Sequence, residues 1–415
     1  MANVLIGVTG GVAAYKVCEV TSTLAKAGVE VRVVMTTKAQ SFVSAVTFAA
    51  LSRRPVCSDQ DFWSAQQGRP LHIELGEWAD VFVIAPLTAN TLAKLAHGFA
   101  DNLLTNTVLA SVCPILLAPA MNTDMWRQVS VQRNWQQLLT EATSISAGRP
   151  ASRYFAVGPG AGRLACDRIG AGRMAEPQEI ITAVYSLLHT QGRNDLAGKH
   201  LLISTGSTQE YIDPVRFIGN PATGRMGIAL AQAAHARGAQ VTLVHGPLTP
   251  ALSQTIPGSI QCHAVTSAAE MEQAMLTNLP QADWVIMAAA VADVRPASMA
   301  AQKLPKKALP KALALATVPD IVAQLAQKKT SHQRIVGFAA QTGDVVTPAL
   351  EKLQRKGLDA IVANPVDKPG SGFASDSNEA VVLLASGEQV AIAHNTKLLV
   401  AHQLYDILLS SFVLT

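Results

Sequence analysis

The sequence predicts an α/β protein of two doubly wound, Rossmann-like domains whose sheets are mainly parallel. The chain has 415 residues, which is more than one ordinary hydrophobic core contains and is enough for two. An apolar run, a glycine-containing turn, a helical stretch and a second apolar run occur in this order in residues 3–36 and again in residues 201–244. This order is typical of a βαβ unit, and open sheets built from such units bind ligands at the carboxyl ends of their strands. We therefore expect one site in each domain.

The composition narrows the classes of partner. Hydrophobic residues make up 49% of the chain and charged residues 15%, which favours buried parallel sheets and large subunit interfaces, so we expect a homo-oligomer. The net charge is +4, without a long basic block or basic residues interleaved with aromatic ones, so we expect neither nucleic acid nor a membrane as a partner. Phosphorylated small molecules fit this modest positive charge.

The cysteines and the apolar runs bear on the compartment. The five cysteines are scattered, odd in number and without a Cys-x-x-Cys pair, which argues against a disulfide framework or a zinc site. No apolar run approaches the ~18 residues that would cross a bilayer, and the first residues indicate a strand instead of a signal peptide. We therefore expect a reducing compartment, the cytoplasm.

The first βαβ unit contains a candidate anion site. Its first strand, residues 4–8, leads into a glycine-rich turn, residues 9–13, and then into a helix that continues to Lys26. Backbone N–H groups of such a turn and of a helix N-terminus suit a phosphate. The turn lacks the G-x-G-x-x-G spacing of a dinucleotide site, so a mononucleotide fits better, and a plain tight turn is an equally good interpretation.

Two further apolar runs, residues 81–86 and 115–118, predict central strands that end in polar loops. The second loop carries Asn122, whose carboxamide can donate N–H groups to a substrate carboxylate. Its apolar neighbours Met121, Met125 and Trp126 would exclude water from such a site. Core packing explains these apolar residues equally well, and helix capping explains the polar loop after residue 86.

Two candidate catalytic residues stand in less regular surroundings. Residues 71–75 alternate as in a strand, which would place His72 on the face of Glu74; an imidazole suits proton transfer near neutral pH, although a lone histidine is usually structural. Residues 147–174 have no regular period and predict a functional loop. Within it Cys166 stands near several arginines, which would favour its ionisation; a surface thiol is the alternative.

A polar run, residues 190–195, predicts a linker after a helix over residues 175–189. The second domain then begins with a strand, residues 201–204, and a glycine-containing turn, followed by a helix over residues 225–237. The start of that helix suits a phosphate, with an ordinary capped helix or a reductase cofactor loop as alternatives. Residues 284–292 predict a buried strand.

Basic residues gather in the second half at two places. A lysine group from Lys303 to Lys311 follows Asp293, and Lys352 and Lys356 stand four apart, so a helix would place these two on one face. Lysines on one face can share a triphosphate, although a solvated basic surface is the ordinary explanation.

Five segments of the first half resemble the flavin-dependent cysteine decarboxylases. They are GVTGGVAAYK at residues 7–16, the segment around His72, APLTANTLAK at residues 85–94, PAMNTDMW at residues 119–126, and GRLACDRIGAGRM at residues 162–174. The resemblance implies a flavodoxin-like flavoprotein fold for this first domain, with catalytic roles for His72, Asn122 and Cys166, the last as an acid on a mobile clamp. It also implies that FMN contacts Gly10, Gly11, Val12, Thr36, Thr88 and Asn90. Asp167 replaces a glycine common in the family, and its charge is expected to oppose thiolate formation.

The second half resembles phosphopantothenate–cysteine ligase at residues 204–227, 289–296, 319–322, 336–340 and 352–364. The resemblance implies catalytic roles for Asn220 and Lys303. It also implies that CTP contacts Met287, Ala288, Ala289, Asp293, Pro319, Asp320, Ile321, Val322, Phe338, Lys352 and Lys356. Pro305 interrupts the usual Lys-x-Lys-Lys pattern and displaces its second lysine. No metal-binding residue is assigned.

By these matches the chain is identified as a member of the bifunctional decarboxylase–ligase family of coenzyme A synthesis, with the decarboxylase in residues 1–190 and the ligase in residues 191–415. The resemblance implies that CTP and Mg²⁺ activate 4'-phosphopantothenate as an acyl-cytidylate, which cysteine attacks. FMN-dependent oxidative decarboxylation of the cysteinyl group then gives 4'-phosphopantetheine. Trimers of decarboxylase domains and dimers of ligase domains are implied, and a dodecamer would combine them.

Two alternatives are a flavin-binding regulatory protein of the same fold and a nicotinamide-dependent oxidoreductase. The intact His72, Asn122 and Cys166 argue against the first, and the missing dinucleotide spacing argues against the second.

Overall fold

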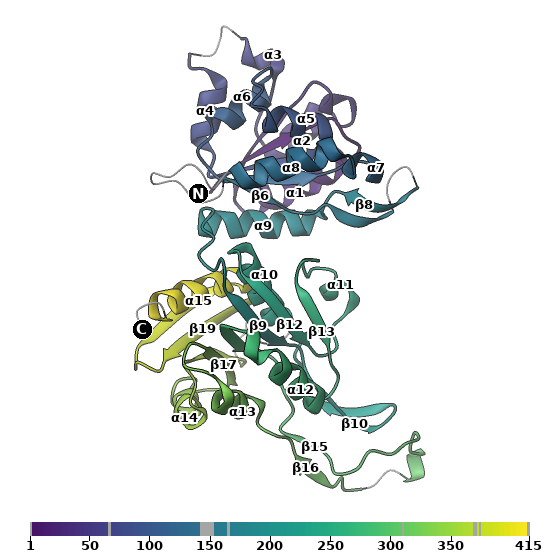
Figure 1. Ribbon diagram of the computed structural model, residues 1–415, viewed down its shortest axis with the longest axis vertical. Coiled ribbons are helices and arrows are strands. Elements are labelled where there is room, and N and C mark those ends of the chain that lie inside the picture. The colour runs from purple at the N-terminus through teal and green to yellow at the C-terminus, as the bar shows by residue number, and fades with distance from the viewer. Residues whose placement is uncertain are drawn as a thin grey trace. The chain divides into compact units, whose positions relative to one another are not determined.

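The computed structural model describes residues 2–64, 68–141, 153–163, 167–308, 311–367, 372 and 375–412. The chain forms two compact units, Met1–Asn194 and Asp195–Thr415 (Figure 1). Each unit has a mainly parallel sheet between two layers of helices, so the predicted fold class is confirmed. Within the described residues, no helix is both long enough and apolar enough to cross a membrane.

The sheet of the first unit is parallel throughout, in the order β3-β2-β1-β4-β5-β6. Its strands are β1 (Asn3–Val8), β2 (Glu30–Met35), β3 (Val56–Ser58), β4 (Val81–Leu87), β5 (Ile115–Pro119) and β6 (Tyr154–Ala156). This is the strand order of the dinucleotide-binding fold, whereas flavodoxin has the order 2-1-3-4-5, so the likeness to flavodoxin lies in the layers. The order reverses between β1 and β4, which opens a crevice at their carboxyl ends.

Alternate residues of β1 serve two separate cores. Val4, Ile6 and Val8 point to one face, and Leu5 points to the other. The first face is covered by α1 (Ala14–Lys26), α2 (Ala45–Ser52) and α9 (Pro177–Thr190). The second is covered by α4 (Leu71–Trp78), α5 (Ala89–Ala96), α6 (Leu103–Ala110) and α8 (Val129–Glu141). Short helical turns, η1 (Ala39–Ser41), α3 (Asp59–Phe62) and α7 (Thr123–Trp126), connect the elements.

The strand expected over residues 71–75 is wrong, because this segment forms the first turns of α4. Five alternating residues fit either period, and burial decides between them: Leu71 and Leu75 are both buried, four residues apart, on one face of the helix. His72 and Glu74 therefore do not share a face.

The irregular loop expected over residues 147–174 is wrong for its described part. Here β6 joins the main sheet, and β7 (Gly160–Arg163) pairs antiparallel with β8 (Ile169–Arg173). Glycine and alanine dominate these two strands, and such residues lack the alternating pattern by which strands are identified from sequence.

The sheet of the second unit has the order β13-β12-β9-β14-β17-β18-β19-β20. The first six strands are parallel and repeat the order of the first unit, and the last two are antiparallel. They are β9 (His200–Thr205), β12 (Gln240–His245), β13 (Gln261–Ala264), β14 (Trp284–Met287), β17 (Arg334–Gln341), β18 (Ala360–Pro365), β19 (Ser377–Leu384) and β20 (Gln389–Thr396). The two units thus share their central architecture.

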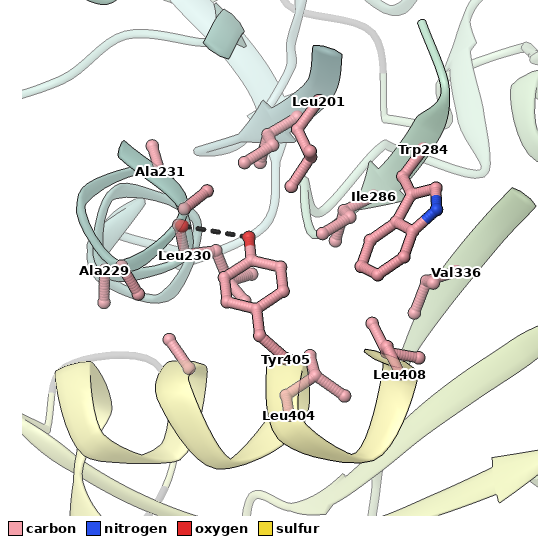
Figure 2. Close-up of a cluster of buried hydrophobic side chains, with 14 of the residues drawn as sticks. Leu201, Ala229, Leu230, Ala231, Trp284, Ile286, Val336, Leu404, Tyr405 and Leu408 are labelled. Carbon is pink, nitrogen blue, oxygen red and sulfur yellow. Dashed lines mark hydrogen bonds between the residues drawn. The ribbon is translucent and has the colours of Figure 1, made fainter. Parts of the chain in front are cut away.

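Two helical layers enclose this second sheet. One face packs against α10 (Arg225–Ala236) and α15 (Lys397–Phe412), and the other packs against α12 (Ala268–Asn278), α13 (Ile321–Lys328) and α14 (Thr347–Lys356). Figure 2 shows Tyr405 of α15 among apolar side chains, with its hydroxyl donating a hydrogen bond of 2.9 Å to the carbonyl of Leu230 in α10. The ring thus supplies buried area while its polar end is satisfied. The remaining helical turns are α11 (Pro250–Ser253), η2 (Leu279–Gln281) and η3 (Lys306–Ala308).

Two excursions leave this sheet at its carboxyl edge. A hairpin of β10 (Gln209–Asp213) and β11 (Arg216–Gly219) stands between β9 and α10, where the sequence analysis expected only a turn. A second pair, β15 (Val294–Pro296) and β16 (Leu315–Thr317), brackets the lysine group. The strand expected over residues 284–292 ends at Met287, because the following alanines turn across β9, where Ala290 N–H donates to the carbonyl of Gly206 over 2.8 Å.

The residues between the units are anchored on both sides. A Cβ at Gly192 would lie 3.1 Å from Phe155 and Pro114 of the first unit, and Arg193 donates to the carbonyl of Thr190. On the other side, Asp195 pairs with the buried guanidinium of Arg237 at 2.7 Å. The polar run at residues 190–195 is therefore fixed at Gly192 and at Asp195, with Arg193 and Asn194 between them, while Gln191, Arg193 and Asp195 are exposed.

Candidate active sites

The first unit has a cavity of about 1230 Å³ at the carboxyl edge of its sheet. It is enclosed by the turn after β1, by the loops after β2, β4 and β5, and by the end of β8. The residues of the flavin and substrate predictions that line it are Gly10, Gly11, Val12, Thr36, Thr88, Asn90 and Asn122. One cavity thus brings together residues that lie up to 112 positions apart in the chain, and their roles stay predictions.

The turn after β1 fits an anion. No side chain caps the amino end of α1, and the N–H groups of Ala14, Tyr15 and Lys16 donate to carbonyls of the preceding turn. The positive end of the helix dipole, and not free N–H groups of this first turn, would therefore favour an anion here. A Cβ at Gly10 would lie 2.6 Å from the Cβ of Lys38, so only glycine permits this close approach of the two loops. The backbone itself therefore forms this wall of the cavity.

Thr88 both caps a helix and lines the cavity. Its hydroxyl accepts the N–H of Thr91 at 3.4 Å at the start of α5, and it lies 3.4 Å from the hydroxyl of Thr9. Thr9 in turn donates to the carbonyl of Pro86 over 2.5 Å. The capping explanation given for this loop therefore holds together with a place at the site.

Asn122 is held in place by α7. Its Oδ1 accepts the N–H of Asp124 at 2.8 Å, which fixes the carboxamide at the end of the short helix. Met121 and Met125 line the cavity beside it. Trp126 instead packs against Trp135, with ring centroids 5.5 Å apart, so this member of the apolar wall belongs to the core.

The β7–β8 hairpin is packed on the loop that carries Asn122. The N–H of Met121 donates to the carbonyl of Gly172 over 2.9 Å, and a Cβ at Gly172 would lie 2.3 Å from the carbonyl oxygen of Met121. Cys166 lies outside the described residues. Its neighbour Asp167 pairs with Arg163 at 2.8 Å, so this charge is balanced within the hairpin.

His72 is not among the residues that line the cavity of its own unit. Its ring meets Phe62 edge-on with centroids 5.3 Å apart, and its Nδ1 is buried and has no hydrogen-bond partner among the described residues. A buried ring nitrogen without a partner costs free energy. The structure of one chain therefore does not bring His72 and Asn122 to a common site.

The second unit has a cavity of about 620 Å³ at the carboxyl edge of its sheet. The predicted ligase residues that line it are Asn220, Met287, Ala288, Ala289, Asp293, Pro319, Asp320, Ile321, Val322, Phe338, Lys352 and Lys356. Asn220 donates from Nδ2 to the carbonyl of Val291 over 3.3 Å. Of the residues assigned to the ligase, only Lys303 is missing from this lining.

The two lysines of α14 differ in their surroundings. Lys356 pairs with Asp320 at 2.9 Å, and Asp320 also accepts the N–H of Ala323 as the cap of α13. Burial raises the pKa of the Asp320 carboxyl, but the hydrogen bond from Lys356 and this N–H outweigh burial, so the pKa lies below its ordinary value. Lys356 thus lines the cavity as a member of an ion pair, and Lys352 lines the same cavity.

Sequence reasoning missed Lys397, which lines this cavity together with Arg225, a residue of the predicted phosphate site at the start of α10. Lys397 is only 7% exposed and donates to the carbonyls of Gly372, at 3.0 Å, and Ser375. Burial, with a smaller contribution from the Arg225 charge, lowers the pKa of Lys397 to about 8. A single lysine before an apolar helix gives no signal in the sequence, because its burial arises from the loop that folds over it.

Lys303 lines a separate cavity of about 560 Å³ with Arg216, Leu304, Pro305 and Lys306. The structure of one chain therefore does not bring Lys303 together with the α14 lysines. In the part of the chain that the structure describes, no three His, Cys, Asp or Glu side chains form a group that could hold a metal ion.

Two doubly wound units, each with a polar cavity at the carboxyl edge of its sheet, define a two-site α/β enzyme. Residues 1–189 match the family "Flavoprotein", and residues 196–411 match "DNA/pantothenate metabolism flavoprotein C-terminal domain". The chain is 40% identical over 406 residues to "Coenzyme A biosynthesis bifunctional protein CoaBC" of Bacillus subtilis (strain 168), covering 97% of this chain and 95% of that protein. It is also 40% identical over 416 residues to the protein of the same name from Mycobacterium tuberculosis (strain ATCC 25618 / H37Rv), with the same coverage.

Among solved structures, the chain is similar to the crystal structure of the C-terminal domain of coenzyme A biosynthesis bifunctional protein CoaBC. The identity is 34%, the TM-score is 0.44, and the match covers 52% of this chain and 97% of that one. The chain belongs to the family of coenzyme A biosynthesis bifunctional proteins. It is a bifunctional enzyme, a phosphopantothenoylcysteine decarboxylase and phosphopantothenate–cysteine ligase, as the sequence analysis predicted.

Proposed function

We propose that the two reactions take place in two separate cavities. The 1230 Å³ cavity of the first unit binds FMN and phosphopantothenoylcysteine, and the 620 Å³ cavity of the second binds CTP and 4'-phosphopantothenate. The observation that carries the proposal is the convergence of the predicted flavin and substrate residues from four loops on the first cavity. Residues 1–190 would thus decarboxylate, and residues 191–415 would ligate.

The first cavity suits FMN in shape and chemistry. The positive end of the α1 dipole, beside the turn after β1, would favour the flavin phosphate. The volume of the cavity exceeds the ~300–1,000 Å³ of common ligand sites, which leaves room for the substrate. Bound FMN would supply a reversible two-electron acceptor for the oxidation of the substrate, with no net redox change over the whole reaction. Asn122 would orient the substrate carboxylate, Met121 and Met125 would exclude water, and Cys166 would donate the final proton.

The position of His72 supports a homo-oligomer as the active form. Because His72 does not line the cavity of its own unit, its proposed catalytic role requires the cavity of a neighbouring copy. Trimers of the decarboxylase unit would supply this contact, with dimers of the ligase unit and a dodecamer as the larger assembly. Subunit mixing tests it: the inactive variants His72→Asn and Asn122→Ala should regain part of the decarboxylase activity when dissociated and reassembled together. Mixed oligomers without any regained activity would contradict the shared site.

The second cavity suits a triphosphate. Lys352, Lys356 and Arg225 contribute cations from two sides, and Asn220 and Asp293 contribute polar groups. Mg²⁺ would neutralise the triphosphate charge, and it commonly needs only one or two protein carboxylates beside the phosphates, a role that Asp293 would fit. Lys303 would stabilise the charge of the acyl-cytidylate step.

The experiment is an assay of both half-reactions on one purified protein. A flavin absorption spectrum is expected, together with cysteine-dependent formation of CMP from CTP and 4'-phosphopantothenate. His72→Asn should abolish oxidation of the substrate thiol, whereas Cys166→Ser should still release CO₂ and stall before the reduced product, because protonation follows decarboxylation. Mass spectrometry separates the two products. A Cys166→Ser enzyme that forms 4'-phosphopantetheine at the parent rate would remove Cys166 from the mechanism.

A further inference from the structure

Asp213, the last residue of β10, has a side chain that is fully buried. Its Oδ1 accepts the N–H groups of Val215 and Arg216, each at 2.9 Å, which closes the turn of the hairpin. Its Oδ2 accepts the N–H of Leu304 at 3.2 Å and pairs with the Arg216 guanidinium at 3.3 Å. Oδ1 therefore accepts from residues of the same hairpin, whereas Oδ2 also accepts from Leu304, which lies 91 residues further along the chain.

Both backbone polar groups of Leu304 are held by this arrangement. Its N–H donates to Asp213, and its carbonyl accepts from Nη2 of Arg216 at 2.6 Å. Leu304 stands between Lys303 and Pro305, so the residue next to the proposed catalytic lysine is fixed on the hairpin. We call these three residues, Asp213, Arg216 and Leu304, the Leu304 clip.

The clip also orients the arginine. Nη2 of Arg216 is used in the clip, whereas its buried Nη1 has no hydrogen-bond partner among the described residues. Arg216 lines the 560 Å³ cavity with Lys303 and Lys306. The Arg216 guanidinium, with its unused donor, and the Lys303 ammonium at one cavity suit a carboxylate or phosphate group of a substrate.

Burial raises the pKa of the Asp213 carboxyl, but N–H donors from Val215, Leu304 and Arg216 and the Arg216 charge outweigh burial. The pKa therefore lies below its ordinary value. The clip is thus ionised throughout the neutral pH range, and its hydrogen bonds are charge-assisted ones.

We propose that Asp213 is a positioning residue of the ligase, which sets the place of Lys303 and Arg216 through the Leu304 clip. The proposal rests on the proposed function through the role of Lys303. Asp213 itself does not touch the substrate; it fixes the segment that does. A displacement of about 1 Å at a reacting centre can cost about 10²-fold in rate, so a loosened clip should reduce turnover by about this factor.

The test is Asp213→Asn, which is nearly isosteric. The asparagine oxygen can still accept from Val215 and Arg216, so the turn persists, while its NH₂ group faces the N–H of Leu304 and the guanidinium and can accept from neither. The ligase kcat should fall about 10²-fold with little change in the KM for CTP. Decarboxylation of added phosphopantothenoylcysteine should keep the parent rate.

Limited trypsin digestion tests, independently of catalysis, whether the Leu304 clip holds the segment around Lys303 in place. The Lys303–Leu304 bond should be cut faster in Asp213→Asn than in the parent, because a protease needs the local chain free of its hydrogen bonds. Hydrogen exchange on the parent needs no variant at all. The Leu304 amide should exchange well below the rate of an unfolded chain, and exchange at that rate would overturn the clip.

Glu210→Gln is the matched control. Glu210 is a buried carboxylate on the same strand, and it accepts the N–H of Ala268 at 2.8 Å without contact to the lysine segment. Its ligase kcat and its cleavage at Lys303 should match the parent. A parental kcat in Asp213→Asn, or an equal loss in Glu210→Gln, would overturn the positioning role. A parental kcat in Lys303→Gln beside faster cleavage in Asp213→Asn would instead refute the assignment of Lys303 and leave the clip intact.

Discussion

At the scale of single residues, Lys303 and Lys306 line the same cavity on either side of Pro305. The two compete for the role that the ligase family gives to its first lysine. Lys303 precedes the clipped Leu304 directly, whereas Lys306 begins the short turn η3. We therefore assign the stabilisation of phosphate and acyl charge to Lys303.

Lys303→Gln should lower the turnover of cysteine-dependent CMP formation by about 10²–10³, which corresponds to ~2.7–4 kcal/mol of lost transition-state stabilisation. Flavin binding and decarboxylation belong to the other unit and should be unchanged. Lys306→Gln is the matched control, with turnover near that of the parent. Near-normal turnover in the first variant with collapse in the second would transfer the role to Lys306.

At the scale of elements, the β7–β8 hairpin depends on Gly172. Its φ is +125°, and an added Cβ would lie 2.3 Å from the carbonyl of Met121, so Gly172→Ala is strained by conformation and by contact. We expect this variant to displace the hairpin from the Asn122 loop and to reduce decarboxylation at least tenfold, with the ligase unchanged. Gly160→Ala in β7 is the control, because its Cβ would have 3.8 Å to the nearest atom, the carbonyl oxygen of Arg173. Equal decarboxylase rates in the two variants would contradict the argument.

The amino end of α15 should give the ligase unit a measurable pH dependence. Lys397, the first residue of α15, has a pKa lowered to about 8, below the ordinary lysine value of 10.5. Between these values the unfolded chain binds the proton and the folded chain does not, so this group's contribution to stability rises with pH from about 8 to 10.5 and is constant below 8. Lys397→Met lacks this contribution.

Differential scanning calorimetry at pH 7.5 and 9.5 measures this contribution of Lys397 to the stability of the ligase unit. The ligase transition is identified by the increase of its Tm with CTP. The Tm of the parent minus that of Lys397→Met should be larger at pH 9.5, and a difference independent of pH would contradict the lowered pKa.

Among the helices and strands, the sequence was most informative where a hydrophobic period continued over many residues. The helix after the first turn and the central strands of the first unit appear within a residue or two of their expected bounds, because each carries a buried face of several residues. Residues 71–75 were too few to separate two periods, and the glycine-rich β7 and β8 had no apolar side chains to alternate. The alanines after Met287 are apolar but too small to fill a core, so they turn across the sheet edge and line a cavity.

The same reasoning explains the outcome for the sites. Residues on loops after parallel strands gathered as expected, since such loops meet at one edge of the sheet. His72 lies on α4, and Lys303 lies on the segment between β15 and η3. The orientation of both segments depends on packing that no local sequence pattern encodes, and neither residue lines the predicted cavity of its unit. Lys397 was missed because its burial depends on contacts with Gly372 and Ser375, which lie 25 and 22 residues earlier in the chain.

At the scale of the whole molecule, the two units should be separable. Each has its own sheet, two cores and a cavity. We expect a fragment of residues 1–193 to bind FMN and to decarboxylate added phosphopantothenoylcysteine at the rate of the full chain. A folded but colourless fragment would contradict the division of function.

A fragment that ends at residue 190, the boundary predicted from sequence, is the informative comparison. It lacks Gly192, which packs on Phe155 and Pro114, and should unfold at a lower temperature. Equal melting temperatures of the two fragments would show that this packing adds nothing.

The anchoring of Gly192 on one unit and of Asp195 on the other has a consequence for the life of the protein in the cell. Proteases cut where several consecutive residues are free to leave their contacts, and here the interval between the anchored residues is only Arg193 and Asn194. The short segment between the two units is therefore a poor protease substrate. Cleavage that removes one unit and leaves the other intact is not expected. We therefore expect synthesis and degradation to keep the two catalytic activities in a constant one-to-one ratio.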